Sequence, residues 1–219
     1  MMARRDRQPV LLLHGIWLIG SAMGLLARRL AAAGYAPHSL TWPSVRGGPD
    51  AAIAAIRAAA VQAAGDGPLH WVGHSLGGLV ALETIRRHPE LPPGRVLCLG
   101  SPLAGSLVAQ ALARYRLARW LTGRSQPLLR VGIGEPPPER QIGSIAGSVS
   151  IGLGAVLADF AGAPHDGTVS VAETRTAWLA DHCTVRASHS GLLFSGEAAR
   201  QTIAFLRDGR FAPTPTGRP

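Results

Sequence analysis

The 219-residue chain is 47% hydrophobic, which is enough to bury a sizeable core in one domain and excludes a disordered chain. Its net charge is +9, and every one of the 22 basic residues is arginine. The arginines are spread along the sequence without interleaved aromatic residues, so we expect a solvated basic surface and no nucleic-acid partner. Transient contact with anionic lipid–water interfaces is the alternative explanation of the charge.

The ends of the chain and its uncharged segments bear on its location. Met1–Arg7 leads directly into an apolar run, which leaves no room for a separate signal peptide and predicts a cytoplasmic protein or an exported one without its leader. The longest uncharged stretch, Gln141–Ala158, is interrupted by glycine and serine, so we expect no membrane span there. Cys98 and Cys183 lie in apolar runs and are expected to be buried free thiols.

Apolar runs alternate with amphipathic segments along the chain, which is typical of a mostly parallel sheet with helices on both faces. The pattern predicts one α/β domain over residues 1–210, with about six strands, a loop at Gly123–Arg140 and a loose tail at 211–219. In chain order, the expected strands are Pro9–Leu13, Tyr35–Trp42, Leu69–Val72, Arg95–Leu99, Gln141–Ala146 and Asp181–Ala187. The helices expected between and after them are Ser21–Ala33, Pro49–Ala64, Leu76–His88, Leu107–Leu121 and Glu197–Leu206.

A serine stands between two of these apolar runs, in Gly73-His74-Ser75-Leu76-Gly77. The preceding run predicts a strand and the following run a helix, which is the context of a nucleophile elbow. Such a turn projects the serine Oγ out of the sheet and needs very small residues two positions before and after the serine. Gly73 and Gly77 meet that need. The alternative for Ser75 is an ordinary helix N-cap at a tight turn.

A serine hydroxyl becomes nucleophilic when a base lies within hydrogen-bond reach and an acidic group orients that base. His189 follows the last predicted strand, and Asp166 lies in a turn-rich segment upstream of it. We therefore expect Asp166 and His189 to complete the site with Ser75. The alternatives are Asp159 or Asp181 for the acid and His165 or His182 for the base, whereas His14 and His74 are expected to be structural hydrogen-bonding groups.

Three ordered blocks of this sequence together resemble the α/β-hydrolase superfamily, in particular its small bacterial lipases and esterases. The resemblance covers most of the chain and implies an α/β-hydrolase fold with little or no lid. It also implies that Ser75 is the nucleophile, Asp166 the orienting acid and His189 the base, with an oxyanion hole made by the backbone N–H groups of Ile16 and Leu76. The blocks are Leu12-Leu13-His14-Gly15-Ile16, the elbow with Gly78 added, and Asp166-Gly167-Thr168-Val169 with Ser188-His189-Ser190-Gly191-Leu192-Leu193.

The reaction expected from this resemblance is hydrolysis of a carboxylic ester with a short-to-medium acyl chain, through an acyl-enzyme at Ser75. The substrate would be a small-molecule ester or a lipid. No metal-ligand spacing and no phosphate-binding glycine loop occur in the sequence, so we expect neither a metal nor a cofactor. A thioesterase or acyltransferase of the same fold, or a non-catalytic hydrolase-like binding protein, is the alternative.

Open α/β sheets bind ligands outside the carboxyl ends of their strands. We therefore expect the substrate to contact apolar side chains that follow the strands. The predicted helix Leu107–Leu121 could form a partial cap, which the sequence does not decide. The expected contacts are Trp17, Leu18, Ile19, Leu103, Leu107 and Leu192.

Overall fold

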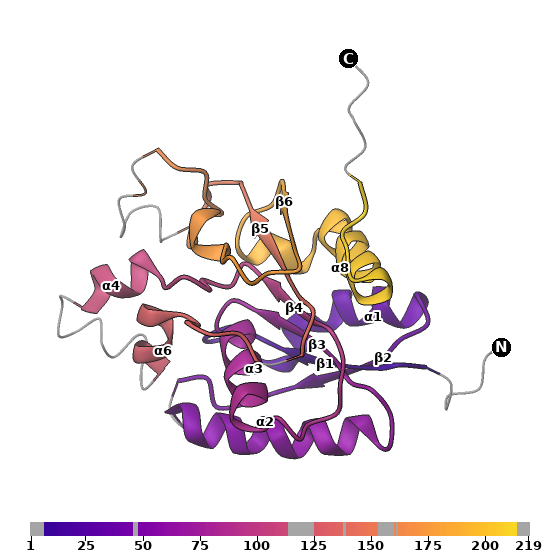
Figure 1. The fold of residues 1–219 in the computed structure, drawn as a ribbon. Coiled ribbons are helices and arrows are strands. Elements are labelled where there is room, and N and C mark those ends of the chain that lie inside the picture. Colours follow the sequence, from indigo (N-terminus) through magenta and orange to yellow (C-terminus); the bar gives the residue numbers. More distant parts are fainter. Residues whose placement is uncertain are drawn as a thin grey trace.

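The computed structural model describes residues 7–45, 48–113, 125–137, 139–152, 160 and 162–213. One six-stranded sheet forms its centre, with parallel strands in the order β2-β1-β3-β4-β5-β6 (Figure 1). The prediction of an α/β fold with a mainly parallel sheet of about six strands is confirmed. The strands are β1 (Pro9–Leu13), β2 (Ala36–Leu40), β3 (His70–His74), β4 (Val96–Leu99), β5 (Ile142–Gly147) and β6 (Asp181–Val185).

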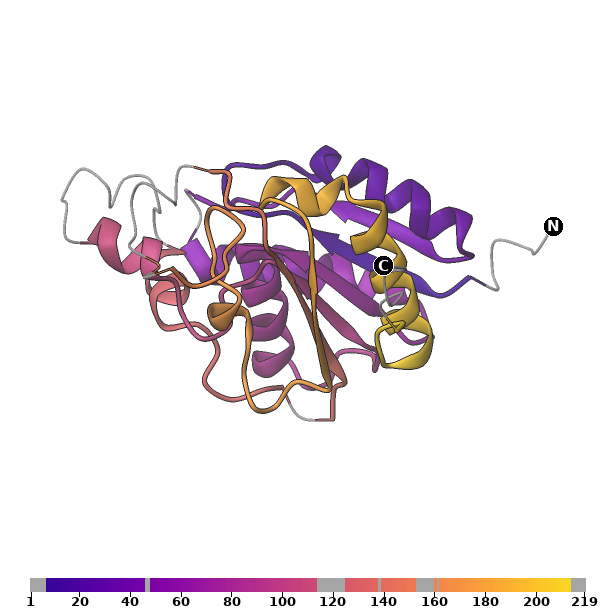
Figure 2. The ribbon, with the colours of Figure 1, turned by 90° about the horizontal axis from the view of Figure 1, so that it is seen from above.

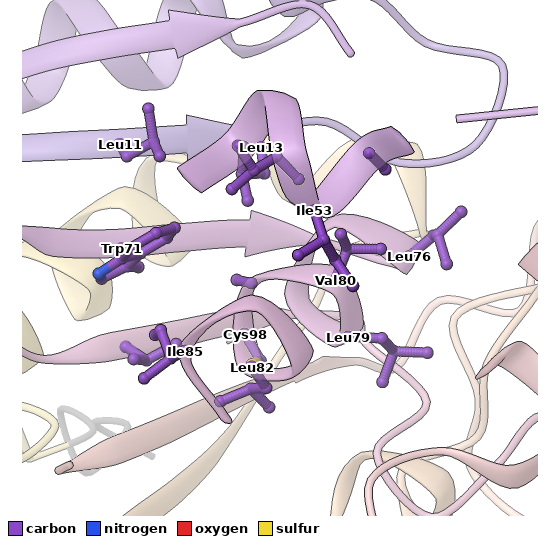
Figure 3. Packing of buried hydrophobic residues seen from close by; sticks show 14 of the residues in the cluster. Leu11, Leu13, Ile53, Trp71, Leu76, Leu79, Val80, Leu82, Ile85 and Cys98 are labelled. Carbon is purple, nitrogen blue, oxygen red and sulfur yellow. The ribbon is translucent and has the colours of Figure 1, made fainter. Parts of the chain in front are cut away.

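Helices cover both faces of the sheet, because successive side chains of a strand point to opposite faces. Leu11 and Leu13 of β1 pack in one core with α2 and α3, as Figure 3 shows for α3 and part of α2, whereas Val10 and Leu12 pack in the other core with α1 and α8. Burial of one such leucine side chain contributes about 2 kcal/mol. The long helices are α1 (Gly24–Ala32), α2 (Gly48–Ala64), α3 (Leu76–Arg87) and α8 (Gly196–Asp208).

Two short helices lie together beyond the carboxyl ends of the strands (Figure 1; Figure 2). They are α4 (Leu107–Ala113) and α6 (Gln126–Val131), and the Ser106 N–H donates to the Leu129 carbonyl at 2.8 Å between them. The expectation of a loop throughout Gly123–Arg140 is therefore wrong at α6. The helix expected at Leu107–Leu121 is present as far as Ala113, and its remainder lies outside the described residues.

Three single turns of 3-10 helix complete the described elements. They are η2 (Gly20–Met23), η4 (Ala172–Thr174) and η5 (Ser190–Leu193). Both η4 and η5 lie close in sequence to predicted site residues: η4 follows the Asp166 segment and η5 follows His189 directly.

The chain remains anchored just after α8. The Phe211 N–H donates to Asp181 Oδ2 at 2.7 Å, and the Phe211 ring lies 5.2 Å from that of Phe205. The Ala212 N–H donates to Gln201 Oε1 at 2.9 Å. The expected loose tail therefore does not begin at Phe211, and residues 214–219 lie outside the described part of the chain.

Two further expectations concern the membrane and the cysteines. Among the helices that the structure describes, none combines the length and apolar character needed to cross a membrane. Cys98 is a buried free thiol on β4, whereas Cys183 on β6 is free and only partly buried. Burial raises the pKa of each thiol to about 12, so neither is a thiolate at neutral pH.

Candidate active site

Ser75 occupies the sharp turn between β3 and α3. Its backbone has φ 53° and ψ −122°, a conformation that costs a non-glycine residue about 1–3 kcal/mol. The Ser75 N–H donates to the Leu99 carbonyl at 2.8 Å, which ties the turn to the end of β4. Neighbouring strands thus hold the serine in a strained conformation at the carboxyl edge of the sheet.

The strand and the helix on either side of Ser75 approach each other closely. A Cβ on Gly73 would overlap the backbone of Gly78, and a Cβ on Gly77 would overlap the carbonyl oxygen of Leu13. The glycines at these positions therefore allow α3 to begin directly against β1 and β3. This is the packing that the elbow pattern requires.

Asp166 and His189 form a hydrogen-bonded pair that is largely shielded from solvent. The His189 Nδ1–H donates to Asp166 Oδ2 at 2.7 Å, and the His189 backbone N–H donates to the Asp166 carbonyl at 2.8 Å. Asp166 Oδ1 accepts the N–H groups of Thr168 at 2.9 Å and Val169 at 2.7 Å. Because Asp166 is fully buried, these bonds replace the water that the carboxylate would otherwise bind.

Gly100, at the end of β4, leaves the space that this pair occupies. Its φ is +56°, and an added Cβ would lie 3.2 Å from both Asp166 Oδ2 and His189 Nδ1. The same Cβ would lie 2.9 Å from Leu192 Cδ1. A side chain here would press on the pair and strain the backbone. Gly100 was not among the predicted site residues; its place directly after a buried strand was the available signal.

Two further imidazoles support the site in neutral form. His74 Nε2–H donates to the His189 carbonyl at 3.0 Å, and burial, reinforced by the nearby His189, lowers the pKa of His74 to about 3. His14 Nδ1–H donates to the Gly15 carbonyl at 2.7 Å, its Nε2 accepts the Trp42 N–H at 3.3 Å, and burial lowers its pKa. Both therefore hold backbone segments in place, in agreement with the structural role expected for them.

The two amides expected to form an oxyanion hole flank the serine. Leu76 begins α3, where a helix has no acceptor for its N–H within its own turns. Ile16 follows the His14-Gly15 pair and lines the same cavity as Ser75. Within the described residues, neither amide donates a hydrogen bond to the protein, so both are free to bind an oxygen.

The described residues considered as alternative acids and bases interact with other partners. Asp181 begins β6 and uses its two oxygens on the N–H groups of His182 and Phe211. His182 Nε2 bonds to Thr174 Oγ1 at 2.9 Å, and burial lowers its pKa to about 4. His165 Nδ1 accepts the Gly167 N–H at 3.1 Å, and its ring stacks on Phe160. Asp159 lies outside the described residues.

Ser75 and His189 open into one cavity of about 640 Å³, a size suited to a small organic ligand. Of the six expected contacts, Trp17 and Leu18 line it. The other four do not: Leu103 and Leu192 are buried in the two cores, and Ile19 and Leu107 point outward, 58% and 41% exposed. The remaining apolar wall is formed by Ile16, Pro102, Val108, Ala109, Leu112, Leu129, Ile151 and Val169.

The wall residues missed on α4 share one face of the helix. Val108 and Leu112 are separated by four positions and project on the same side as Ala109, whereas Leu107 projects away from them. The i, i+4 spacing was the available signal. Leu129 was missed because its segment was expected to be a loop; Pro127 near the start of α6 is a helix-start signal.

Candidate metal ligands give no competing site. In the part of the chain that the structure describes, no three His, Cys, Asp or Glu side chains gather as a metal-binding group would require.

Comparisons with known proteins agree with this architecture. Among solved structures, the mature form of the lipase BlEst2 from Bacillus licheniformis is similar with a TM-score of 0.74 and 19% identity, over 94% of this chain and 93% of that one. The metagenomic carboxyl esterase MGS0156 gives a TM-score of 0.62 and 16% identity, over 83% and 64%. A pyrethroid hydrolase from Sphingobium faniae JZ-2 gives 0.60 and 16%, over 93% and 98%.

These identities are low, so the structural likeness establishes the fold alone. Among curated proteins, none matches the sequence. The model of the alpha/beta hydrolase family, however, matches residues 10–215, a range that contains the elbow, the Asp166–His189 pair and the amides of Ile16 and Leu76. The chain therefore belongs to the α/β-hydrolase family.

Proposed function

We propose that this α/β hydrolase is a serine carboxylic ester hydrolase that acts on short-to-medium acyl esters through an acyl-enzyme at Ser75. The observation that carries the proposal is the 2.7 Å bond between His189 Nδ1 and Asp166 Oδ2, beside a serine held in a strained elbow on the same cavity. That bond leaves His189 Nε2 unprotonated and available as a base. The lipase and the carboxyl esterase among the similar structures are in keeping with it.

The mechanism uses groups of this chain only. Ser75 Oγ attacks the ester carbonyl carbon while His189 Nε2 takes the hydroxyl proton, and Asp166 stabilises the resulting imidazolium. The negative oxygen of the tetrahedral intermediate is held by the N–H groups of Ile16 and Leu76. His189 then returns the proton to the departing alcohol. Water repeats the sequence on the acyl-enzyme, which releases the carboxylic acid and restores the serine.

The cavity supports an uncharged acyl group as the part of the substrate that is bound. Its wall is mainly aliphatic, and its polar lining includes hydroxyl groups and the imidazoles of His74 and His189. Among the described residues that line it there is neither an arginine nor a carboxylate, so a charged acyl group would lose its hydration there without a partner. The volume of about 640 Å³ lies within the range that accommodates small ligands.

The proposal is tested by hydrolysis of p-nitrophenyl esters from acetyl to dodecanoyl by wild type and Ser75→Ala. We expect wild type to prefer short or medium chains, and the variant to lose at least about 10⁴-fold in kcat. Equal rates in both proteins, or no rate in either, would refute the proposal. Acyl thioesters of matched chain length separate the thioesterase alternative, which predicts faster thioester cleavage.

A further inference from the structure

Glu173 is a buried carboxylate that takes no part in the mechanism above, and it joins two segments of the site. Its Oε2 accepts the Ser170 N–H at 2.5 Å, while Ser170 Oγ accepts the Glu173 N–H at 3.2 Å. This reciprocal pair in Ser-Val-Ala-Glu has the hydrogen-bond pattern of a capping box and spans the start of η4. Glu173 is only 6% exposed, so its carboxylate depends on protein donors.

The second carboxylate oxygen of Glu173 bonds outside the capping box, to α4. Glu173 Oε1 accepts the N–H of Leu107, the first residue of α4, at 2.6 Å. The backbone carbonyl of Glu173 accepts the Ala104 N–H at 2.9 Å in the segment that leads into α4. One residue therefore anchors the start of α4 through both its side chain and its backbone. A negative charge at this end of a helix is also favoured by the helix dipole.

The same capping box is continuous with the loop that carries the catalytic acid. Ser170 follows Val169, whose N–H donates to Asp166 Oδ1 and whose carbonyl accepts the Asp166 N–H at 3.0 Å. Val169 lines the cavity, and so do Val108 and Leu112 of α4. Glu173 thus links two walls of the same cavity, one formed by α4 and the other by the loop that carries Asp166.

We propose that Glu173 is a positioning residue that fixes α4 against the Asp166 loop and thereby sets the preference for acyl-chain length. The proposal rests on the ester hydrolysis proposed above. An acetyl group that occupies only the region beside Ser75 does not reach the α4 wall, whereas a longer chain packs against it. Loss of the hydrogen bond between Glu173 and Leu107 should therefore weaken binding of long acyl chains and leave the chemistry at Ser75 nearly unchanged.

The test compares Glu173→Gln with Ser170→Ala. Glutamine keeps one acceptor oxygen but places an NH₂ donor against one of the two amides, so a bond is lost at a buried site. We expect its KM for p-nitrophenyl octanoate to rise about tenfold, while kcat/KM for the acetate stays within about threefold. Ser170→Ala removes only the hydroxyl bond inside the capping box, and it should retain the chain-length preference of wild type.

A second variant removes the partner instead of the carboxylate. Leu107→Pro deletes the donor N–H at the first position of a helix, where proline is well tolerated, and the leucine side chain points away from the cavity. It should show the same selective rise in KM for octanoate. If Glu173→Gln does not fold, this variant alone decides: an unchanged preference in folded Leu107→Pro overturns the proposal.

Amide hydrogen exchange separates this inference from the proposed function. We expect exchange at Leu107 to be about tenfold faster in Glu173→Gln than in wild type, and unchanged in Ser170→Ala. If wild type hydrolyses no ester, the proposed function fails, and equal exchange at Leu107 would then overturn the anchoring role independently. If wild type is active and Glu173→Gln loses acetate and octanoate hydrolysis equally, the role in chain-length preference is overturned.

Discussion

Among single residues, Asp166 allows the effect of a negative charge to be tested with little change in side-chain shape. Asparagine has the same shape but presents an NH₂ donor either to His189 Nδ1–H or to the amides of Thr168 and Val169. The neutral side chain also cannot stabilise an imidazolium. We therefore expect Asp166→Asn to lower kcat by about 10³–10⁴-fold with little change in KM, measured on p-nitrophenyl butyrate.

Asp181→Asn provides the matched control. This carboxylate is also hydrogen-bonded to two backbone amides, but it lies at the amino end of β6, away from the catalytic pair. Its kcat should stay within a few-fold of wild type, although some stability is lost with the anchor of Phe211. Comparable losses of kcat in the two variants would contradict the role assigned to Asp166.

The residues proposed to be catalytic could be named from the sequence because the chemistry restricts the residue type and the order along the chain. Ser75, Asp166 and His189 follow three different strands, and each stands at a carboxyl end, where the structure brings them together. The substrate wall was not accessible in the same way. Leu103 and Val108 are both apolar and both follow β4, and only packing decides that one enters the core and the other the cavity.

At the scale of elements, the β3–elbow–α3 unit depends on backbone contact. A methyl group on Gly73 would meet the backbone of Gly78, which cannot move without displacing α3 from the sheet. We expect Gly73→Ala to lower the free energy of unfolding by about 3 kcal/mol or more, measured by urea denaturation. Activity per folded molecule should fall as well, because the same shift moves Ser75.

Gly24→Ala is the control for this prediction. Gly24 begins α1, its φ is −61°, and no atom lies within 4 Å of the position that a Cβ would take. Alanine favours a helix over glycine, so this variant should be as stable as wild type or more stable by up to about 1 kcal/mol. If both glycine variants unfold at the same urea concentration, close packing at the elbow is not the reason for Gly73.

The elements themselves were predicted unevenly. The bounds of the six strands differ from the prediction by one or two residues at most. The buried strands β1 and β4 are continuous apolar runs, whereas the edge strands β2 and β6 carry polar residues and are only partly buried. The six-residue helix α6 was missed because prolines and glycines surround it. Its helical turn is stabilised by tertiary contacts, including the bond from Ser106 to Leu129, which local composition does not reveal.

At the scale of the whole molecule, part of the arginine excess holds the fold together. Arg29 donates to the carbonyls of Phe194 and Ser195 at 2.9 Å and so ties α1 to the start of α8. Arg95 donates to the Leu206 and Arg207 carbonyls in the last turn of α8 at 2.7 and 3.0 Å. Arg140 donates to the Leu91 and Pro92 carbonyls, both at 2.7 Å. Arg140 reaches its two carbonyls with Nη1 and Nη2, a forked geometry that a lysine cannot supply.

Buried histidines make global stability depend on pH. Burial lowers the pKa of His14, that of His74 to about 3, and those of His70 and His182 to about 4. In the unfolded chain each histidine has a pKa of about 6.5, so below that pH the unfolded state binds more protons than the folded one. The contribution of these neutral histidines to the free energy of unfolding is therefore fully present above about pH 7, and it is lost as the pH falls toward 4.

His70 allows this to be measured away from the active site. Its Nε2–H donates to Gln8 Oε1 at 3.1 Å, and its Nδ1 accepts the Arg95 N–H at 3.0 Å, so protonation would break the second bond. Between pH 7 and pH 5 this group should cost about 2 kcal/mol of unfolding free energy. His70→Gln should reduce the acid loss by about that amount in urea titrations at the two pH values.

His38→Gln serves as the comparison, because His38 is exposed on the edge strand β2. It should keep the same acid-induced loss of stability as wild type. Identical differences between pH 7 and pH 5 in wild type and His70→Gln would show that burial of His70 does not produce the effect.

We propose that Ser75, activated by the Asp166–His189 pair, is the nucleophile of this hydrolase. A fluorophosphonate probe followed by peptide mass mapping tests it most directly, because the adduct reports the reacting atom without knowledge of the natural substrate. We predict a single adduct on Ser75 that forms in the folded protein and is strongly reduced in His189→Ala. An adduct on another residue would show that Ser75 is not the nucleophile. Equal labelling of Ser75 in wild type and His189→Ala would show that His189 does not activate it.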